Sequence, residues 1–517
     1  MNMKNIKSYI SAFALAIGLS FSSCVNDLDV TPIDPNLDTA DKVFSTADDF
    51  KSFLAECYAG FATSSYKGPN GEANMDGIDG GFSQYFRGLF HMNELTTDEA
   101  ICGWNDQTLQ DLHALAWTPS DVFVTAIYYR FFHQAAICNE FLRQAQKTTI
   151  NVPDMEAYKA EVRTLRAICY MHAIDLFGNV PFADENHPIG YYPEQISRTE
   201  LFNWLETELK DIIENSALAN ARQNEYGRID KGAAKMILAK LYLNAEVYTG
   251  TAKWNECAQI CKSIVADGYS LHPDYQELFL ADNHNCTDEI IFAIQQDGID
   301  IQSYGVTNYI IFASTGGKMD TKAVGISSGW GGLRTTPEFY DSFQAGDKRS
   351  LFYTTGHEKE IESIAEFTHG YAFMKFKNIN SDGTLGKAEG FVDTDFPLFR
   401  FADVLLMLAE CGLHNASEVS TEQGLAYLNQ VRERAGLAPQ NSYDAEDIIR
   451  ERGCELYQEC WRRSDLIRFN KFTTSDYLWS WKGGVKDGKS VSSHMNLFPI
   501  PTDDLNSNPN LTQNPGY

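Results

Sequence analysis

The sequence predicts a mainly α-helical fold in which paired helices form a scaffold and long irregular segments lie over it. Apolar residues recur at helical spacing along much of the chain, and glycine-rich stretches interrupt this pattern at residues 66–107 and 270–395. The chain has 517 residues, of which 44% are hydrophobic and 22% charged, so it is long enough to bury a large core. We therefore expect residues 40–517 to form a single domain.

The N-terminus has the pattern of a secretion signal. Two lysines precede an apolar stretch over residues 9–21, which is too short to span a bilayer, and Cys24 follows small residues. Lipoprotein processing cuts before such a cysteine and attaches lipid to it. We expect residues 1–23 to be a signal peptide, Cys24 to carry the anchor and residues 24–39 to be a polar tether. The alternative is an ordinary secreted protein in which this cysteine is incidental.

Helical periodicity begins with residues 40–62 and is clearest in two hairpins. The first pairs residues 233–245 with 254–265 across a Thr-Gly-Thr break, and the second pairs a helix through 401–408 with one through 425–435. Small residues near each crossing make both pairs resemble tetratricopeptide units. The open apolar face of such a unit must be covered by neighbouring pairs, so the scaffold is expected to be a stack.

The remaining segments lack a long helical period. Glycines divide the aromatic and acidic residues of 66–107, which predicts an ordered but irregular loop region. Between 270 and 395, β-like runs at 289–295 and 372–376 alternate with polar loops, which indicates an insertion over the helical frame. Loops held by a rigid frame commonly carry binding residues. The tail, residues 498–517, contains four prolines and is expected to pack extended along the surface.

The net charge of −28 argues against a nucleic-acid or other polyanionic partner, because the summed field would repel phosphates and sulfates. A neutral ligand is favoured instead.

Patterns that would indicate an enzyme are weak. The residues Gly325 to Gly329 match G-x-S-x-G, but the sequence around Ser327 lacks the strand and helix that expose a serine nucleophile. A zinc-protease motif, a P-loop and a dinucleotide-binding motif are also missing from the sequence. A glycosidase carboxylate pair depends on a separation in space, which the sequence does not give. A glycoside hydrolase on a helical scaffold therefore stays open as an alternative.

Several other conspicuous residues are expected to be structural. Most of the eleven cysteines lie in apolar helical patterns and are expected to be buried free thiols, and Cys257 and Cys261 lack the further ligands of a zinc site. His172 has apolar neighbours, which predicts a core histidine. The charged run 462–465 is expected to form a structural network.

Several blocks together resemble the SusD/RagB family of outer-membrane glycan-binding lipoproteins, in particular its starch-binding branch. They are distributed over the whole chain: Arg163–Ala167, Leu176–Pro181, Lys240–Ala245, Asp395–Asp403, Trp461–Phe469, Tyr477–Gly484 and Pro499–Pro501. The resemblance implies four tetratricopeptide-like units and a lipid-anchored protein that faces the cell exterior. It also implies a partner, a SusC-like TonB-dependent outer-membrane barrel, which receives the bound oligosaccharides.

The resemblance also assigns a sugar site. Its members are the stacking rings Trp104, Tyr304 and Trp330 and the polar residues Asp79, Arg87 and Gln107. Sugar rings present flat C–H faces to aromatic rings, whereas their hydroxyls need carboxylate, amide or guanidinium partners. Two positions depart from the family's founder, because Cys102 stands where it has a further Trp and Gln107 where it has an Asn. For each ring, the alternative is that it packs inward.

The founder's calcium site has a partial counterpart here. Gln296, Asp393 and Asp395 match three oxygen ligands, but His284 stands near the position of another acidic ligand, and histidine is a poor calcium ligand. The alternative is that the two aspartates cap a helix that begins at Pro397. A structural calcium is thus possible, and no cofactor is expected to be required.

The function expected from all of this is non-catalytic binding of starch, that is α-1,4-glucan and its maltooligosaccharides, at the outer membrane. The same scaffold with a different neutral glycan is the first alternative, and a glycoside hydrolase is the second.

Overall fold

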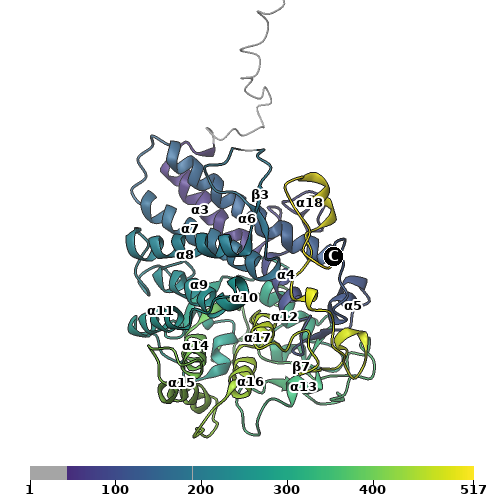
Figure 1. Ribbon diagram of the computed structural model, residues 1–517. Helices are drawn as coiled ribbons and strands as arrows, with labels where there is room; N and C mark the ends of the chain where they lie inside the picture. The colour runs from purple at the N-terminus through teal and green to yellow at the C-terminus, as the bar shows by residue number, and fades with distance from the viewer. Residues whose placement is uncertain (1–42, 189) are drawn as a thin grey trace, which may run out of the picture.

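The computed structural model describes residues 43–188 and 190–517, which form a mainly helical structure (Figure 1). The predicted fold class is confirmed. The long helices form a pile that runs down the left side of Figure 1, from α3 and α6 at the top to α14 and α15 at the bottom. They are α3 (Ala47–Ala62), α6 (Val122–Lys147), α7 (Met155–Leu176), α8 (Arg198–Asn215), α9 (Lys231–Leu243), α11 (Trp254–Ala266), α14 (Phe401–Leu413), α15 (Thr421–Arg434) and α16 (Ala445–Leu456).

Neighbouring helices in this pile pack against each other in a continuous series. Helix α6 packs on α7, α7 on α8, α8 on α9, α9 on α11, α11 on α14, and α14 on both α15 and α16. Both predicted hairpins are confirmed, as α9 with α11 and as α14 with α15. Stacking of this kind buries the apolar face that each pair would otherwise expose. The tetratricopeptide character of the pairs stays a prediction.

Local capping explains where several of these helices begin. The Asp230 carboxylate accepts hydrogen bonds from the backbone N–H groups of Gly232 and Ala233 at the start of α9. At α15, Ser420 and Gln423 form a reciprocal capping box. Each cap satisfies N–H groups that have no partner inside the helix, which stabilises a helix by about 0.5–2 kcal/mol. Within the described residues, no helix is both long and apolar enough to cross a membrane.

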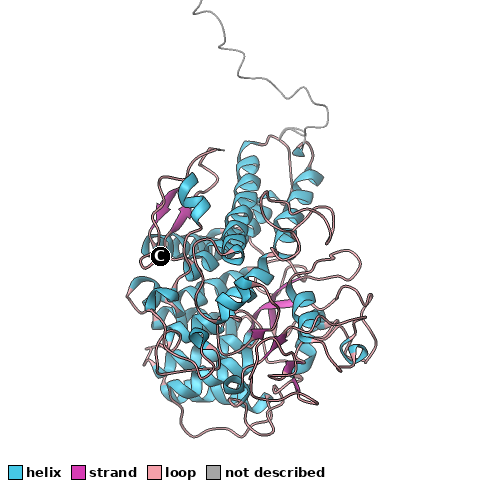
Figure 2. Cartoon of the chain, turned by 90° about the vertical axis from the view of Figure 1, so that its right-hand side faces the viewer, coloured by secondary structure: helices cyan, strands magenta, loops and turns pink. Residues whose placement is uncertain are grey.

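Shorter elements lie beside the pile. The short α-helices are α4 (Tyr85–Asn93), α5 (Gln107–His113), α10 (Ala245–Thr249), α12 (Val306–Ser314), α13 (Pro337–Tyr340), α17 (Arg462–Arg468) and α18 (Thr502–Ser507). The strands, which are magenta in Figure 2, are β1 (Ile101–Cys102), β2 (Val180–Phe182), β3 (Glu194–Ile196), β4 (Ile290–Ile294), β5 (Leu333–Arg334), β6 (Phe352–Tyr353), β7 (Ala372–Phe373) and β8 (Phe396–Arg400). The 3₁₀ helices are Tyr275–Phe279, Asn283–Asn285, Thr321–Val324, Lys482–Gly484 and Ser493–Asn496.

The strands form three small antiparallel sheets. One has the order β1-β5-β7-β6, and the other two pair β2 with β3 and β4 with β8. In the largest sheet, Ile101 pairs with Arg334 and Cys102 with Leu333. This register joins the segment after residue 100 to the segment before residue 335, and therefore brings the two predicted loop regions together.

Several expectations about the loop regions are corrected by the structure. Residues 66–107 are irregular only in part, because they contain the fully buried helix α4 and strand β1. The region 270–395 similarly contains the buried helix α12. The β-like run at 289–295 is confirmed as β4, whereas the run at 372–376 forms only the two-residue strand β7. The glycines near α4 hid its helical period, since Gly88 is inside the helix at a place where a Cβ would meet Ile127 on α6.

The ends of the described chain also differ from expectation. The helix expected over 40–62 begins at Ala47, capped by Thr46, and residues 40–42 lie outside the described residues. The tail is not purely extended along the surface, because it contains α18 and fully buries Phe498 and Ile500. The signal peptide, Cys24 and the tether lie outside the described residues.

A cluster of buried charges connects the second hairpin to the loop-rich side. We call it the Arg400 cluster, and its members are Glu289, Lys375, Arg400, Arg434, Glu455 and Glu459. The Arg400 guanidinium donates to Glu459 at 2.7 Å, to Glu289 at 2.6 Å and to Glu455 at 2.9 Å. Lys375 donates to Glu459 at 2.6 Å. These side chains are almost completely shielded from solvent, so each charge depends on its partners inside the protein.

Candidate functional site

The three aromatic rings assigned to the sugar site form one row. The ring centroids of Tyr304 and Trp330 are 6.1 Å apart with their planes at 62°, and those of Trp330 and Trp104 are 6.3 Å apart at 52°. All three side chains are partly exposed. The structure therefore brings Trp104 together with Trp330, which is 226 residues further along the sequence, and with Tyr304, and it leaves each ring accessible from outside.

The β1–β5 pairing explains why two of these rings meet. Trp104 follows β1 and Trp330 precedes β5, and the Gly103 N–H donates to the Gly332 carbonyl at 3.0 Å. The indole N–H of Trp104 then reaches the Trp330 carbonyl at 3.4 Å. Gly332 is required here, because a Cβ at this position would lie 2.6 Å from the Trp104 indole nitrogen.

The third ring is held by contacts of its own. Tyr304 lies just before α12, and its hydroxyl donates to the Asn70 side-chain oxygen at 2.9 Å. Its ring also packs on Phe391 at a centroid distance of 5.4 Å. Asn70 and Phe391 were not singled out from the sequence, because their place beside Tyr304 follows only from the folded loops.

Arg87 and Asp79 have different relations to the row. Arg87 is 8% exposed, lies over the Tyr309 ring at 4.4 Å, and donates to the carbonyls of Gly81 at 2.8 Å and Tyr304 at 3.2 Å. Burial lowers its pKa, although an arginine still stays charged. Arg87 thus shapes the loop that carries Tyr304. Asp79 is exposed and accepts the Gly81 N–H at 2.6 Å, so its carboxylate is open to a ligand.

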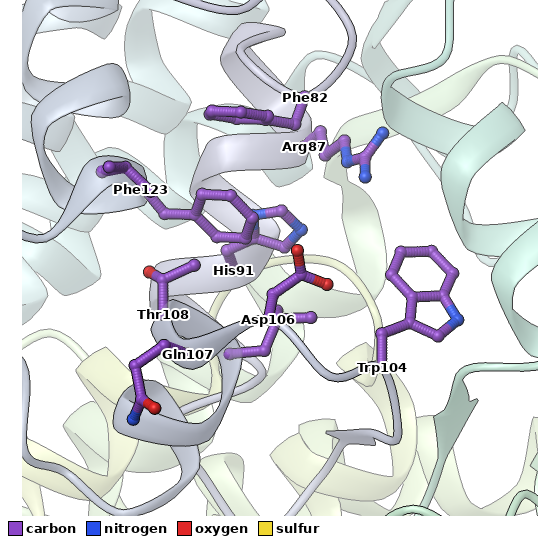
Figure 3. A pocket seen from close by; sticks show the side chains of 10 residues that line it. Phe82, Arg87, His91, Trp104, Asp106, Gln107, Thr108 and Phe123 are labelled. Atoms are coloured by element: carbon purple, nitrogen blue, oxygen red, sulfur yellow. The ribbon is translucent and has the colours of Figure 1, made fainter.

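Beside Trp104 lies a pocket of about 400 Å³ between α4, α5 and the start of α6 (Figure 3). Gln107 lies on its rim, and its amide donates to Asp111 at 2.9 Å. Four other lining residues, Phe82, His91, Asp106 and Phe123, were not indicated separately by any pattern in the sequence. Two of them, Phe82 and Asp106, belong to the segments that carry Arg87 and Trp104. His91 and Phe123 are helix residues that only the packing of α4 against α6 brings here.

Comparison with known proteins gives a consistent result. Residues 358–517 match the SusD family, and the whole chain is 33% identical to the starch-binding protein SusD of Bacteroides thetaiotaomicron, with 100% of both chains covered. This chain belongs to the SusD family.

Solved structures share the fold of this SusD-family chain. A surface glycan-binding protein A from Bacteroides fluxus has a TM-score of 0.71 at 22% identity, covering 91% of this chain and 100% of that one. The corresponding protein from Bacteroides thetaiotaomicron, solved in complex with laminarihexaose, has a TM-score of 0.71 at 19% identity, covering 91% and 99%.

The residues assigned to calcium line a common pocket in this SusD-family chain, together with His284, Asp297 and Lys387. The Asp395 carboxylate accepts the Gln296 N–H and the Tyr226 hydroxyl, both at 2.8 Å. The Asp393 carboxylate accepts hydrogen bonds from the backbone N–H groups of Gly298 at 2.8 Å and Lys387 at 2.5 Å.

Calcium binding at this pocket stays a prediction. The Lys387 ammonium, on a largely exposed side chain, pairs with Asp297 at this pocket. Within residues 43–188 and 190–517, no three His, Cys, Asp or Glu side chains are grouped so as to hold a metal ion. The capping alternative is wrong, because Phe396–Arg400 form strand β8 and the next helix begins at Phe401.

Cys102, which stands where the founder of the family has a further Trp, is buried. Its side chain is 1% exposed and packs in the core beneath β1. Its sulfur lies beneath Trp104, since a Cβ built on Gly332 would contact both the Cys102 sulfur and the Trp104 indole. A tryptophan at this position would have to displace packed side chains before it could extend the row.

The residues expected to be structural behave as such. Ser327 lies in a loop after the 3₁₀ helix Thr321–Val324, and His172 is buried with its Nδ1 2.9 Å from the Tyr85 hydroxyl. Arg462 forms a two-pronged ion pair with Asp98, and Asp465 pairs with Arg452. The ten cysteines of the described chain are all buried and free.

Proposed function

We propose that this SusD-family protein binds starch-like α-1,4-glucan on the row formed by Tyr304, Trp330 and Trp104, and that it does so without catalysis. The observation that carries the proposal is the row itself, since three partly exposed rings are held side by side on loops fixed by a small sheet. Large apolar rings left open to solvent are typical of a binding surface. The starch-binding relative that is 33% identical over the full length supports the choice of sugar.

The tilt between the rings favours a curved ligand. Neighbouring planes differ by 62° and 52°, so successive sugar faces that lie on them must turn along the chain. A helical α-glucan turns in this way, whereas a flat ribbon would contact fewer rings. Asp79 lies open to solvent two residues from Gly81, whose carbonyl Arg87 holds, and it is the carboxylate that we expect to meet sugar hydroxyls.

The test is titration calorimetry with maltoheptaose. Replacing any one of the three rings with Ala should weaken binding by about 1–3 kcal/mol, and replacing all three should abolish it. Trp254→Ala is the matched control, because this partly exposed tryptophan stacks on His414 in the helical pile instead. A triple variant that binds as well as the original protein would refute the proposal.

A different neutral glycan is the second candidate, because a structure with the same fold holds laminarihexaose. Affinity gels containing amylopectin, pullulan, xylan or a fructan separate the possibilities. Retardation by the first two supports α-glucan, and retardation only by the others refutes it.

For the hydrolase alternative, the purified protein is incubated with maltoheptaose. Shorter products that disappear in a single carboxylate variant would contradict a purely binding role.

We also propose that the protein is anchored through Cys24 at the outer membrane, faces the cell exterior, and hands oligosaccharides to a SusC-like TonB-dependent barrel. The signal-like N-terminus and the family support this proposal. Cys24→Ala should move the protein from the membrane fraction to the soluble fraction and leave glucan binding intact, since the anchor supplies only location. Retention in the membrane fraction would contradict the lipid anchor.

A further inference from the structure

The pocket beside Trp104 continues the ring row inward. Trp104 is the last ring of the row and also one wall of the pocket. The opposite wall is aromatic, since the ring centroids of Phe82 and Phe123 are 4.7 Å apart and the His91 ring stacks on Phe123 at 4.6 Å. A ligand that leaves the row at Trp104 therefore enters a space closed by side chains on its far side.

His91 has an unusual environment for a buried polar side chain. It is 1% exposed, and neither of its ring nitrogens has a hydrogen-bond partner among the described residues. The Nε of Arg87 is likewise unpartnered in the described part of the chain. Leaving such a group unsatisfied costs about 1–3 kcal/mol, so these atoms indicate a ligand that supplies the missing hydrogen bonds.

The protonation state of His91 suits a hydroxyl. Burial lowers its pKa well below the usual value, and the positive charge of Arg87 lowers it further. The neutral imidazole then offers one N–H donor and one acceptor nitrogen. A sugar hydroxyl can both accept and donate, whereas an anionic group could use only the donor. Figure 3 shows the His91 ring, the Asp106 carboxylate and Trp104 around the same space.

We propose that this pocket is an end subsite that holds the terminal hexose residue of a linear oligosaccharide lying on the ring row. The His91 nitrogens and the exposed Asp106 carboxylate bind hydroxyls of that residue, and Trp104 and Phe82 contact its C–H faces. A volume of about 400 Å³ is at the small end of ligand pockets and suits a single sugar ring. This inference rests on the proposed function, and it adds that the protein recognises a chain end.

A pair of ligands with and without chain ends tests the subsite. Maltohexaose is linear, whereas α-cyclodextrin contains the same number of glucose units in a closed ring. His91→Phe keeps the ring against Phe123 but removes both nitrogens, and Asp106→Asn changes only the exposed carboxylate. Each variant should weaken maltohexaose binding by roughly five- to tenfold and leave α-cyclodextrin binding unchanged. Asp48→Asn, an exposed carboxylate on α3, is the control and should change neither.

The outcomes separate the subsite from the row. Trp330→Ala should weaken binding of both ligands, because both use the rings. The subsite is refuted if Asp106→Asn and a folded His91→Phe protein lose affinity for both ligands equally, or for neither. If the original protein binds neither ligand, the proposed function itself fails, and the inference fails with it.

Discussion

The ring row and the Arg400 cluster differ in how far their side chains are exposed and in how far their polar groups are paired. In the row, large rings are partly exposed and nearby polar atoms of His91 and Arg87 lack partners among the described residues. In the Arg400 cluster, acidic and basic side chains are buried together and bonded to each other. The difference teaches which features indicate a ligand. Polar groups without partners next to open rings suggest binding, whereas buried charges that pair with one another stabilise the fold.

The largest effect is expected from breaking the Arg400 cluster. Arg400→Met removes the guanidinium that pairs with the buried carboxylates of Glu289, Glu455 and Glu459. This should lower the free energy of unfolding by about 3–5 kcal/mol. Urea denaturation measures this free energy. The control is Lys159→Met, which removes a more exposed pair with Glu156 and should change stability by less than about 1 kcal/mol. Similar losses of unfolding free energy in the two variants would show that the buried cluster contributes no more than an exposed ion pair.

Acid should weaken the same cluster. Burial opposes ionisation of Glu455, but the guanidiniums of Arg434, Arg400 and Arg349 outweigh it and lower its pKa from 4.5 to about 2. Because the folded pKa lies below the unfolded one, its contribution is complete above about pH 4.5 and is lost as the pH falls towards 2. The loss amounts to about 3 kcal/mol. The free energy of unfolding, measured from denaturation curves across this range, should depend less on pH in Glu455→Gln. An unchanged pH dependence would show that Glu455 does not cause the loss.

A smaller effect is expected where the ring row meets the core. Cys102→Trp forces a large ring into a packed site and should destabilise the protein by about 1–3 kcal/mol without tightening maltoheptaose binding. Thermal melts and calorimetry measure both quantities. Gln107→Asn is the matched change at an exposed position and should leave stability within about 0.5 kcal/mol. Tighter binding by the Cys102→Trp protein would show that this position reaches the ligand after all.

The smallest effect is expected from chelation. EDTA should leave the melting temperature and glucan binding essentially unchanged, since Lys387 already pairs with Asp297 at the pocket of Asp393 and Asp395. Lys387→Ala removes this positive charge, and calcium should stabilise that variant more than the original protein. A large fall in melting temperature that calcium alone reverses in the original protein would show a structural metal.

The sequence predicted the parts of the fold that depend on local periodicity. Helices α9, α11, α14 and α15 each repeat their apolar residues within one segment, so their pairing could be inferred. Helix α4 could not, because glycines precede it and one lies inside it, and because its polar residues Arg87 and His91 are buried with the rest. Helix α12 could not be inferred either, because all of its residues are buried and its first residue, Val306, has a positive φ of 49°.

The candidate site was predictable mainly through the family resemblance. No local pattern connects Trp104 with Trp330, because their contact depends on the register of two-residue strands. The partners of Arg400 in the Arg400 cluster are likewise 55 to 111 residues away from it along the chain. His91 has the pattern of an ordinary core residue, and only the packed structure shows that it lines a pocket and that its buried nitrogens lack partners among the described residues.

The pairing of β1 with β5 also affects the thermodynamics of binding. Trp104 and Trp330 are attached to the same small sheet, and the indole N–H of one is bonded to the carbonyl of the other. Their relative position is therefore set before a ligand arrives, and little conformational entropy remains to be lost when it binds. The platform is preorganised, so its selectivity should depend on the shape of the glycan that approaches it.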